Sequence, residues 1–225
     1  MISGVSGVSG VSRVTRVYRR LRFGQPVIVI SGLPRSGTSM VMKMLEAGGL
    51  EVLTDGVRAA DENNPNGYYE LERVTRLNID EDRSWLVEAR GKAIKIISFL
   101  LTYLPESNDY QVIFMHRNLD EVIRSQNAML VQRRQAIGET SDETFHALYE
   151  KHLKQVKSFL GARRSFEVLD VAYAEVLAAP GDEAARMSRF LGRGLNLELM
   201  EAAVDRQLYR NRSLNGLRSG NYAAQ

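Results

Sequence analysis

Apolar residues follow two spacings along the chain. Short runs rich in Val, Ile and Phe predict buried strands at 27–31, 92–97, 110–117 and 165–171, with a weaker one at 51–53. Apolar residues three and four positions apart predict helices at 37–47, 120–134, 142–161 and 181–192, a helix starting near Tyr69, and an apolar helix or loop up to Pro105. Strands alternating with helices indicate an α/β fold with a central parallel sheet covered on both faces.

The first residues differ in composition from the rest of the chain. Residues 1–23 repeat Ser-Gly-Val, then become rich in Arg, and contain no acidic residue. This composition is typical of a transit peptide or a disordered leader, and the second interpretation is preferred. We therefore expect a disordered basic leader at 1–23, one domain at 24–208 and a flexible C-terminal tail at 209–225.

Composition narrows the classes of protein. The chain has no cysteine, which excludes disulfides, thiolate metal ligands and cysteine nucleophiles. Its longest apolar run, 93–104, is shorter than the roughly 18 residues needed to span a bilayer, and Lys95 interrupts it. The sequence contains no basic module with interleaved aromatic residues, which is the pattern that would indicate nucleic-acid binding. We expect a cytoplasmic protein with no integral membrane segment and no nucleic-acid partner; the sequence leaves its oligomeric state open.

A glycine-rich loop follows the first predicted strand. Gly32, Gly37 and Ser39 fit the phosphate-binding pattern G-x-x-x-x-G-K-[ST], but Thr38 replaces the Lys and a cation appears instead at Arg35. Loop amides and a helix N-terminus at a strand's carboxyl end bind anions. The fold class is therefore predicted to be a P-loop NTPase-like three-layer sandwich, with an anion at this loop.

A P-loop kinase using ATP and magnesium is one alternative. Such an enzyme normally uses the missing Lys and an Asp at a strand end. Here the strand at 110–117 ends in His116 and Arg117, although another strand offers Asp170. The kinase alternative depends on Asp170 holding a metal ion at the loop.

The segment "GLPRSGTSM" closely resembles the 5′-phosphosulfate loop of sulfotransferases that use 3′-phosphoadenosine 5′-phosphosulfate (PAPS). The resemblance implies that Arg35 is the cation for the phosphosulfate and that no metal is needed. The donor-binding residues it implies here are Leu33, Pro34, Arg35, Ser36, Gly37, Thr38 and Ser39.

Two further segments match this family. Members bind the 3′-phosphate through R-N-P-x-D-x-x-x-S, and "RNLDEVIRS" supplies Arg117 and Ser125, with Asp120 as the acidic residue and Leu119 replacing Pro. The segment "LDVAYAEVLAAP" resembles the family's segment near the adenine, which makes Tyr173 the corresponding aromatic residue.

The catalytic residues are harder to transfer. Where the cytosolic enzymes have a strand with a Lys and a catalytic His, "IKIIS" retains Lys95 but has Ile97 in place of the His. Other branches use a Glu some twenty to thirty residues after the loop, so Glu62 and Glu70 are the candidate bases, with Asp55 behind them. Arg35 and Lys95 would stabilise the leaving group.

The sequence therefore predicts a PAPS-dependent sulfotransferase that modifies a hydroxyl or amine of a small-molecule or glycan acceptor. The family's late basic segment is not recognisable in "YRNRSLNGLRSGNYAAQ". Because of this and the missing His, a degenerate adenosine-bisphosphate-binding protein remains the alternative outside enzymes.

Overall fold

The computed structural model describes residues 13–55, 69–132 and 141–205 of the 225-residue chain. Glu62 and the predicted C-terminal tail at 209–225 lie outside these ranges. No helix in the described ranges is long and apolar enough to cross a membrane.

Four parallel strands form the central sheet in the order β2-β1-β3-β4. The central strands are β1 (Val27–Gly32) and β3 (Tyr110–His116), and the outer strands are β2 (Ala93–Lys95) and β4 (Phe166–Ala172). The predicted parallel α/β sandwich is confirmed.

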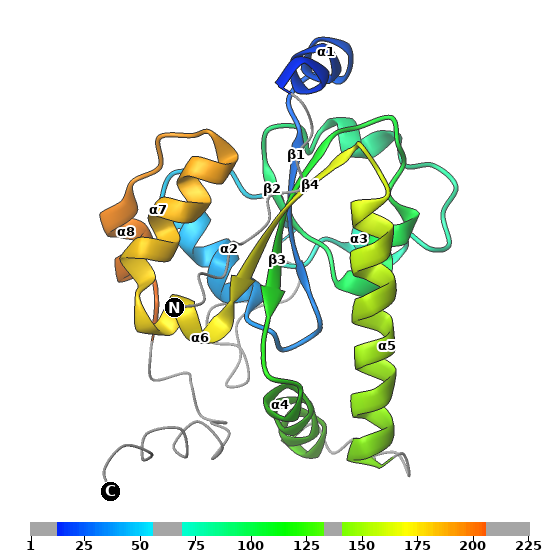
Figure 1. Cartoon of the computed structure of the whole chain (residues 1–225), viewed down its shortest axis with the longest axis vertical. Coiled ribbons are helices and arrows are strands. Elements are labelled where there is room, and N and C mark those ends of the chain that lie inside the picture. The colour runs from blue at the N-terminus through cyan, green and yellow to red at the C-terminus, as the bar shows by residue number, and fades with distance from the viewer. Residues whose placement is uncertain (1–12, 56–68, 133–140, 206–225) are drawn as a thin grey trace, which may run out of the picture.

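Helices cover both faces of this sheet (Figure 1). On one face lie α2 (Thr38–Ala47), α6 (Tyr173–Ala178), α7 (Pro180–Leu191) and α8 (Leu197–Ala202). On the other lie α3 (Glu72–Thr75) and α5 (Asp142–Gly161). Two short 3₁₀ helices, η1 (Ser84–Val87) and η2 (Ser98–Tyr103), lie between α3 and α5 in the sequence. At the carboxyl ends of the strands lies α4 (Leu119–Gln132), whereas α1 (Arg13–Phe23) lies at the opposite edge (Figure 1).

The continuous apolar run of β1 has a simple structural explanation. Ile28 and Ile30 belong to the core cluster beneath α2 and α7, while Val27 and Val29 belong to the cluster beneath α5. Successive strand side chains point to opposite faces, so a strand covered on both faces is apolar at every position. All four side chains have no exposed surface.

Some local predictions need correction. The helix expected near Tyr69 begins only at Glu72 and has four residues, because Tyr69 adopts a left-handed φ of 49° that a helix cannot contain. The strand expected at 51–53 reduces to one bridge between Val52 and Ala93. Residues 13–23, which the sequence assigns to a disordered leader, form α1. By contrast, α7 ends as predicted at Gly192, which has the left-handed φ of 64° typical of a helix C-terminus.

Candidate active site

The glycine-rich loop has a conformation that only certain residues allow. Gly32 has a φ of 149°, and a Cβ there would lie 2.5 Å from Ser36 Oγ and 2.7 Å from the Met115 carbonyl oxygen. Gly37 has a φ of 103°, and a Cβ there would lie 2.5 Å from the Tyr173 ring. Arg35 holds a left-handed φ of 70° without being glycine. Such strained non-glycine residues concentrate at functional loops.

The start of α2 is open to an anion. Its N-cap, Gly37, provides no side-chain acceptor for the first N–H groups of the helix. Thr38 and Ser39 add hydroxyls at the same end, and the buried Ser36 Oγ has no hydrogen-bond partner in the described part of the chain. Unsatisfied donors at a helix N-terminus favour an oxyanion. Leu33 and Pro34 complete the loop, and Leu33 packs into the cluster with α4 and α5.

Two predicted anion-binding segments converge at this loop. Arg35 Nε donates to Ser125 Oγ over 3.1 Å, although the two residues are 90 positions apart. Arg117 Nη1 donates to the Arg35 carbonyl oxygen, also over 3.1 Å. Because Arg117 follows β3 and Ser125 lies on α4, the strand and helix deliver both side chains to the loop, as the sequence predicts.

Arg117 is held from two further sides. Its Nε donates to Glu121 Oε2 over 3.0 Å, and both side chains are at least nine-tenths buried. The Tyr173 ring lies 4.3 Å from the centre of the Arg117 guanidinium. Burial raises the pKa of the Tyr173 hydroxyl above its ordinary value, so that the ring is neutral beside the cation. These contacts hold the Arg117 guanidinium at the edge of the loop.

The acidic residue of this motif was assigned wrongly from the sequence. Asp120 is exposed and lies 3.9 Å from His146, whereas the neighbouring Glu121 is buried against Arg117. In R-N-P-x-D, the acidic residue stands four positions after the Arg, and counting from Arg117 gives Glu121. That i,i+4 spacing was the available signal.

The two candidate catalytic residues outside the loop lie together. Lys95 ends β2 beside the carboxyl end of β1, and its Nζ lies 3.8 Å from Glu70 Oε1. The Lys95 side chain is 9% exposed, against 37% for Glu70. The Glu70 carbonyl oxygen accepts a hydrogen bond from the Thr54 hydroxyl, which fixes the backbone at this point.

The nearby Asp55 carboxylate has a structural role. Its Oδ2 accepts a hydrogen bond of 2.6 Å from the Glu72 backbone N–H at the start of α3. This contact stabilises the first turn of the helix.

Asp170, on which the kinase alternative depends, pairs with a histidine. Its Oδ1 lies 2.6 Å from His116 Nε2, and this hydrogen bond holds the pKa of Asp170 below its ordinary value. Within the described ranges, no group of three or more His and acidic residues could hold a metal ion. The observed pairing gives the kinase alternative no support.

One feature near the site was not predicted. His152 on α5 lies 2.9 Å from Ser98 Oγ, three residues after Lys95, and its ring stacks on Phe99 at a centroid distance of 3.8 Å. Burial lowers the pKa of His152 below its ordinary value, which favours the neutral imidazole. No sequence signal connects His152 with Ser98, because only the packing of α5 against η2 brings them together.

Comparison with known proteins places this geometry in a class. The model of the sulfotransferase family matches residues 70–196, more than half of the chain, and the chain belongs to that family. It is similar in fold to a sulfotransferase from Mycobacterium tuberculosis H37Rv, with 16% identity, 89% of this chain and 82% of that chain covered, and a TM-score of 0.52. It also matches the sulfotransferase domain of an olefin synthase from Synechococcus PCC 7002, with 17% identity, 86% and 82% coverage and a TM-score of 0.48. A search of curated proteins finds no significant match.

Proposed function

We propose that this sulfotransferase uses PAPS as its donor and transfers the sulfuryl group to a hydroxyl or amine of a small-molecule or glycan acceptor. The observation that carries the proposal is the convergence of Arg35, Arg117 and Ser125 at the uncapped start of α2. Two guanidinium groups, a hydroxyl and the helix N-terminus provide donors for the two anionic ends of such a nucleotide.

The donor-binding roles follow from position. The loop residues Leu33–Ser39, which include Arg35, would hold the 5′-phosphosulfate. Arg117 with Ser125 would hold the 3′-phosphate. Tyr173 would lie beside the nucleoside, since its ring already packs against Gly37 and Arg117. The Arg35–Ser125 hydrogen bond positions both side chains at the loop. The bound donor would replace part of this interaction.

The transfer reaction needs positioning and charge stabilisation. The bound donor supplies the sulfuryl group: its bond from sulfur to the phosphate oxygen breaks as a bond from sulfur to the acceptor oxygen or nitrogen forms. Arg35 and Lys95 stabilise the charge left on the phosphate oxygen. Glu70, beside Lys95, accepts the proton of the acceptor. Glu62 remains the second candidate base.

Donor binding is the first experiment. Isothermal titration would compare adenosine 3′,5′-bisphosphate with ATP–magnesium on the wild type, Arg117→Ala and Ser125→Ala. We expect the bisphosphate to bind the wild type and to bind Arg117→Ala roughly a hundredfold more weakly, because the variant loses a charged hydrogen-bond donor. Ser125→Ala keeps the Arg117–Glu121 ion pair, so a loss of binding in this variant is distinguished from a loss of folding. Arg124→Ala, an exposed cation on the same helix, is the matched control.

Each alternative has a distinct result. Binding of ATP–magnesium alone, indifferent to Arg117, would replace the sulfotransferase proposal by the kinase. Tight bisphosphate binding with no release of adenosine bisphosphate from PAPS in the presence of phenols, sugars and amines would favour the degenerate binding protein.

If the enzyme turns over, Glu70→Gln should lower the turnover rate by on the order of a hundredfold or more at unchanged donor affinity. Glu72→Gln, which changes an exposed carboxylate, should not lower it.

A further inference from the structure

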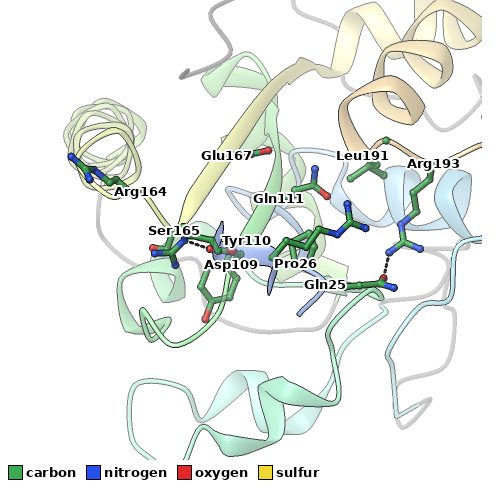
Figure 2. Close-up of a pocket in the computed structure, with 13 residues that line it drawn as sticks. Gln25, Pro26, Asp109, Tyr110, Gln111, Arg164, Ser165, Glu167, Leu191 and Arg193 are labelled. Carbon is green, nitrogen blue, oxygen red and sulfur yellow. Dashed lines mark hydrogen bonds and ion pairs between the residues drawn. The ribbon is translucent and has the colours of Figure 1, made fainter. Parts of the chain in front are cut away.

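A second polar cavity lies at the opposite edge of the sheet from the candidate active site. It has a volume of about 170 Å³ and opens beside the amino ends of β1, β3 and β4 (Figure 2). Its lining combines α1, these strands and the end of α7: Arg19, Arg20, Gln25, Pro26, Asp109, Tyr110, Gln111, Arg164, Ser165, Glu167, Leu191, Gly192 and Arg193. The strands run the length of the sheet between this cavity and the loop at Gly32, so the two sites are separate.

Positive charge exceeds negative charge in this lining, with four arginines against two carboxylates. The Asp109 carboxylate already pairs with Arg19. The second carboxylate, Glu167, also takes part in a polar interaction. Arg20 forms no ion pair with any residue in the described ranges, and within these ranges the Arg193 guanidinium donates to the neutral Gln25 amide oxygen, over 2.6 Å. Two guanidinium groups at the cavity therefore lack a compensating carboxylate.

Figure 2 labels two of the lining arginines, Arg164 and Arg193. Arg193 reaches toward Gln25 across the opening, whereas Arg164 points away from the other lining residues. Arg164 therefore does not contribute to a site that includes Arg193.

The Arg193 side chain is held in place by its surroundings. Gly91 has a φ of 78°, and a Cβ there would lie 2.5 Å from Gln25 Oε1 and 3.4 Å from Arg193 Nη2. This glycine leaves the space in which Gln25 and Arg193 form their hydrogen bond. A guanidinium fixed in this way binds an anion at less cost in side-chain entropy.

Two buried polar atoms at the cavity also lack partners. Ser165 Oγ and Arg19 Nη2 make no hydrogen bond with any described residue, and Ser165 is only 4% exposed. A buried polar group without a hydrogen-bond partner lowers the stability of the folded state. Ser165 lies at the other end of the lining from Arg193 (Figure 2), so an anion at Arg193 does not contact Ser165.

We propose that this cavity binds a small dianionic oxyanion, namely sulfate, phosphate or the phosphate of a small monoester, through Arg20 and Arg193. The cavity has room for such an anion with several waters. Since Arg20 belongs to α1, the bound anion also connects this basic helix to the edge of the sheet. This proposed oxyanion site does not rest on the identity of the donor or acceptor proposed for the candidate active site.

The test is isothermal titration of the full chain with sodium sulfate, sodium phosphate and phenyl phosphate at constant ionic strength set by sodium chloride. We expect the Arg20→Gln/Arg193→Gln variant to bind the anion at least about tenfold more weakly than the wild type, because each lost guanidinium removes a charge-assisted hydrogen bond. Arg189→Gln, an exposed residue of α7 outside the lining, should bind as the wild type does.

The active-site loop also attracts anions, so Arg117→Ala is measured in parallel. Binding that persists in Arg117→Ala and is lost in the double variant supports the proposal. A loss confined to Arg117→Ala, or no anion-specific heat with the wild type, overturns it. Binding of phenyl phosphate as well as phosphate identifies a monoester ligand; binding of the inorganic anions alone identifies a free oxyanion.

Hydrogen exchange provides a second measurement. We expect sulfate to slow exchange of the α1 backbone amides in the wild type and in Arg189→Gln, but not in the double variant. Equal exchange with and without sulfate in the wild type would contradict the proposed connection of α1 to the edge of the sheet.

Discussion

At the scale of single residues, Gly37 joins two functions in one position. It provides the left-handed turn that ends the loop, and it leaves the space filled by the Tyr173 ring. An L side chain is strained at its φ of 103°, and a Cβ would lie 2.5 Å from an aromatic carbon that cannot move freely. The loop conformation therefore depends on glycine for two independent reasons.

The substitution Gly37→Ala tests this dependence. We expect it to lower the free energy of unfolding by about 1–3 kcal/mol and to weaken adenosine bisphosphate binding. Urea denaturation and titration would measure both effects. Gly194→Ala is the control, because nothing lies within 4 Å of a Cβ there. Equal behaviour of the two variants would show that the Gly37–Tyr173 contact does not constrain the loop.

His152 gives the protein a predictable pH dependence. Burial lowers its pKa in the folded chain, so as pH falls through about 6.5 the unfolded chain takes up the proton first. This contribution to stability is complete above that pH and decreases as pH falls through the window below it. We expect the urea midpoint of the wild type to decrease as the pH is lowered from 7.5 to 5.5. His152→Gln should make this decrease smaller. His146→Gln, on the same helix, is the matched control.

At the scale of elements, the first turn of α4 holds the cation at the edge of the loop. Glu121 lies in this turn, buried to 97%, and pairs with Arg117 just before the helix. Removing one partner of a buried ion pair leaves the other charge uncompensated. The turn therefore supports both the folded state and the position of the Arg117 guanidinium.

Glu121→Ala should lower the free energy of unfolding by about 3 kcal/mol and weaken adenosine bisphosphate binding. Asp120→Ala changes the adjacent exposed carboxylate and should affect stability by less than about 0.5 kcal/mol. Denaturation and titration of both variants provide the comparison. Wild-type binding in Glu121→Ala would mean that Arg117 is positioned without its partner.

At the scale of the whole molecule, the sheet separates two hydrophobic clusters, and α8 completes one of them. Met200 is fully buried against α2 and lies close to Gly48, which is the C-cap of that helix. The glycine-rich loop is at the other end of α2. The packing of α8 and the proposed donor site therefore lie at opposite ends of one helix.

Met200→Ala should accordingly lower the free energy of unfolding by about 2–4 kcal/mol while leaving the donor affinity of the folded protein unchanged. Leu199→Ala, exposed on the same helix, should have little effect on stability. A large loss of bisphosphate binding in folded Met200→Ala would show that the two ends of α2 are coupled.

The sequence by itself determined the succession of strands and main helices along the chain, the glycine-rich loop and the motif at Arg117 and Ser125. These features depend on local properties: the apolar period of a strand or helix, the conformational freedom of glycine, and fixed spacings along the chain. The short helices were harder to predict, since α6 and α8 have six residues each and too few turns for a clear period. The left-handed Tyr69, which delays α3, has no local signature.

Only the tertiary structure decided which side chains meet. It joined Arg35 to Ser125 across 90 positions, paired Lys95 with Glu70, and put the buried Glu121 rather than Asp120 against Arg117. It also brought α1, three strand starts and the end of α7 around one basic cavity. A pattern along the chain records which face of its own element a residue occupies, but contacts between elements depend on how the layers pack.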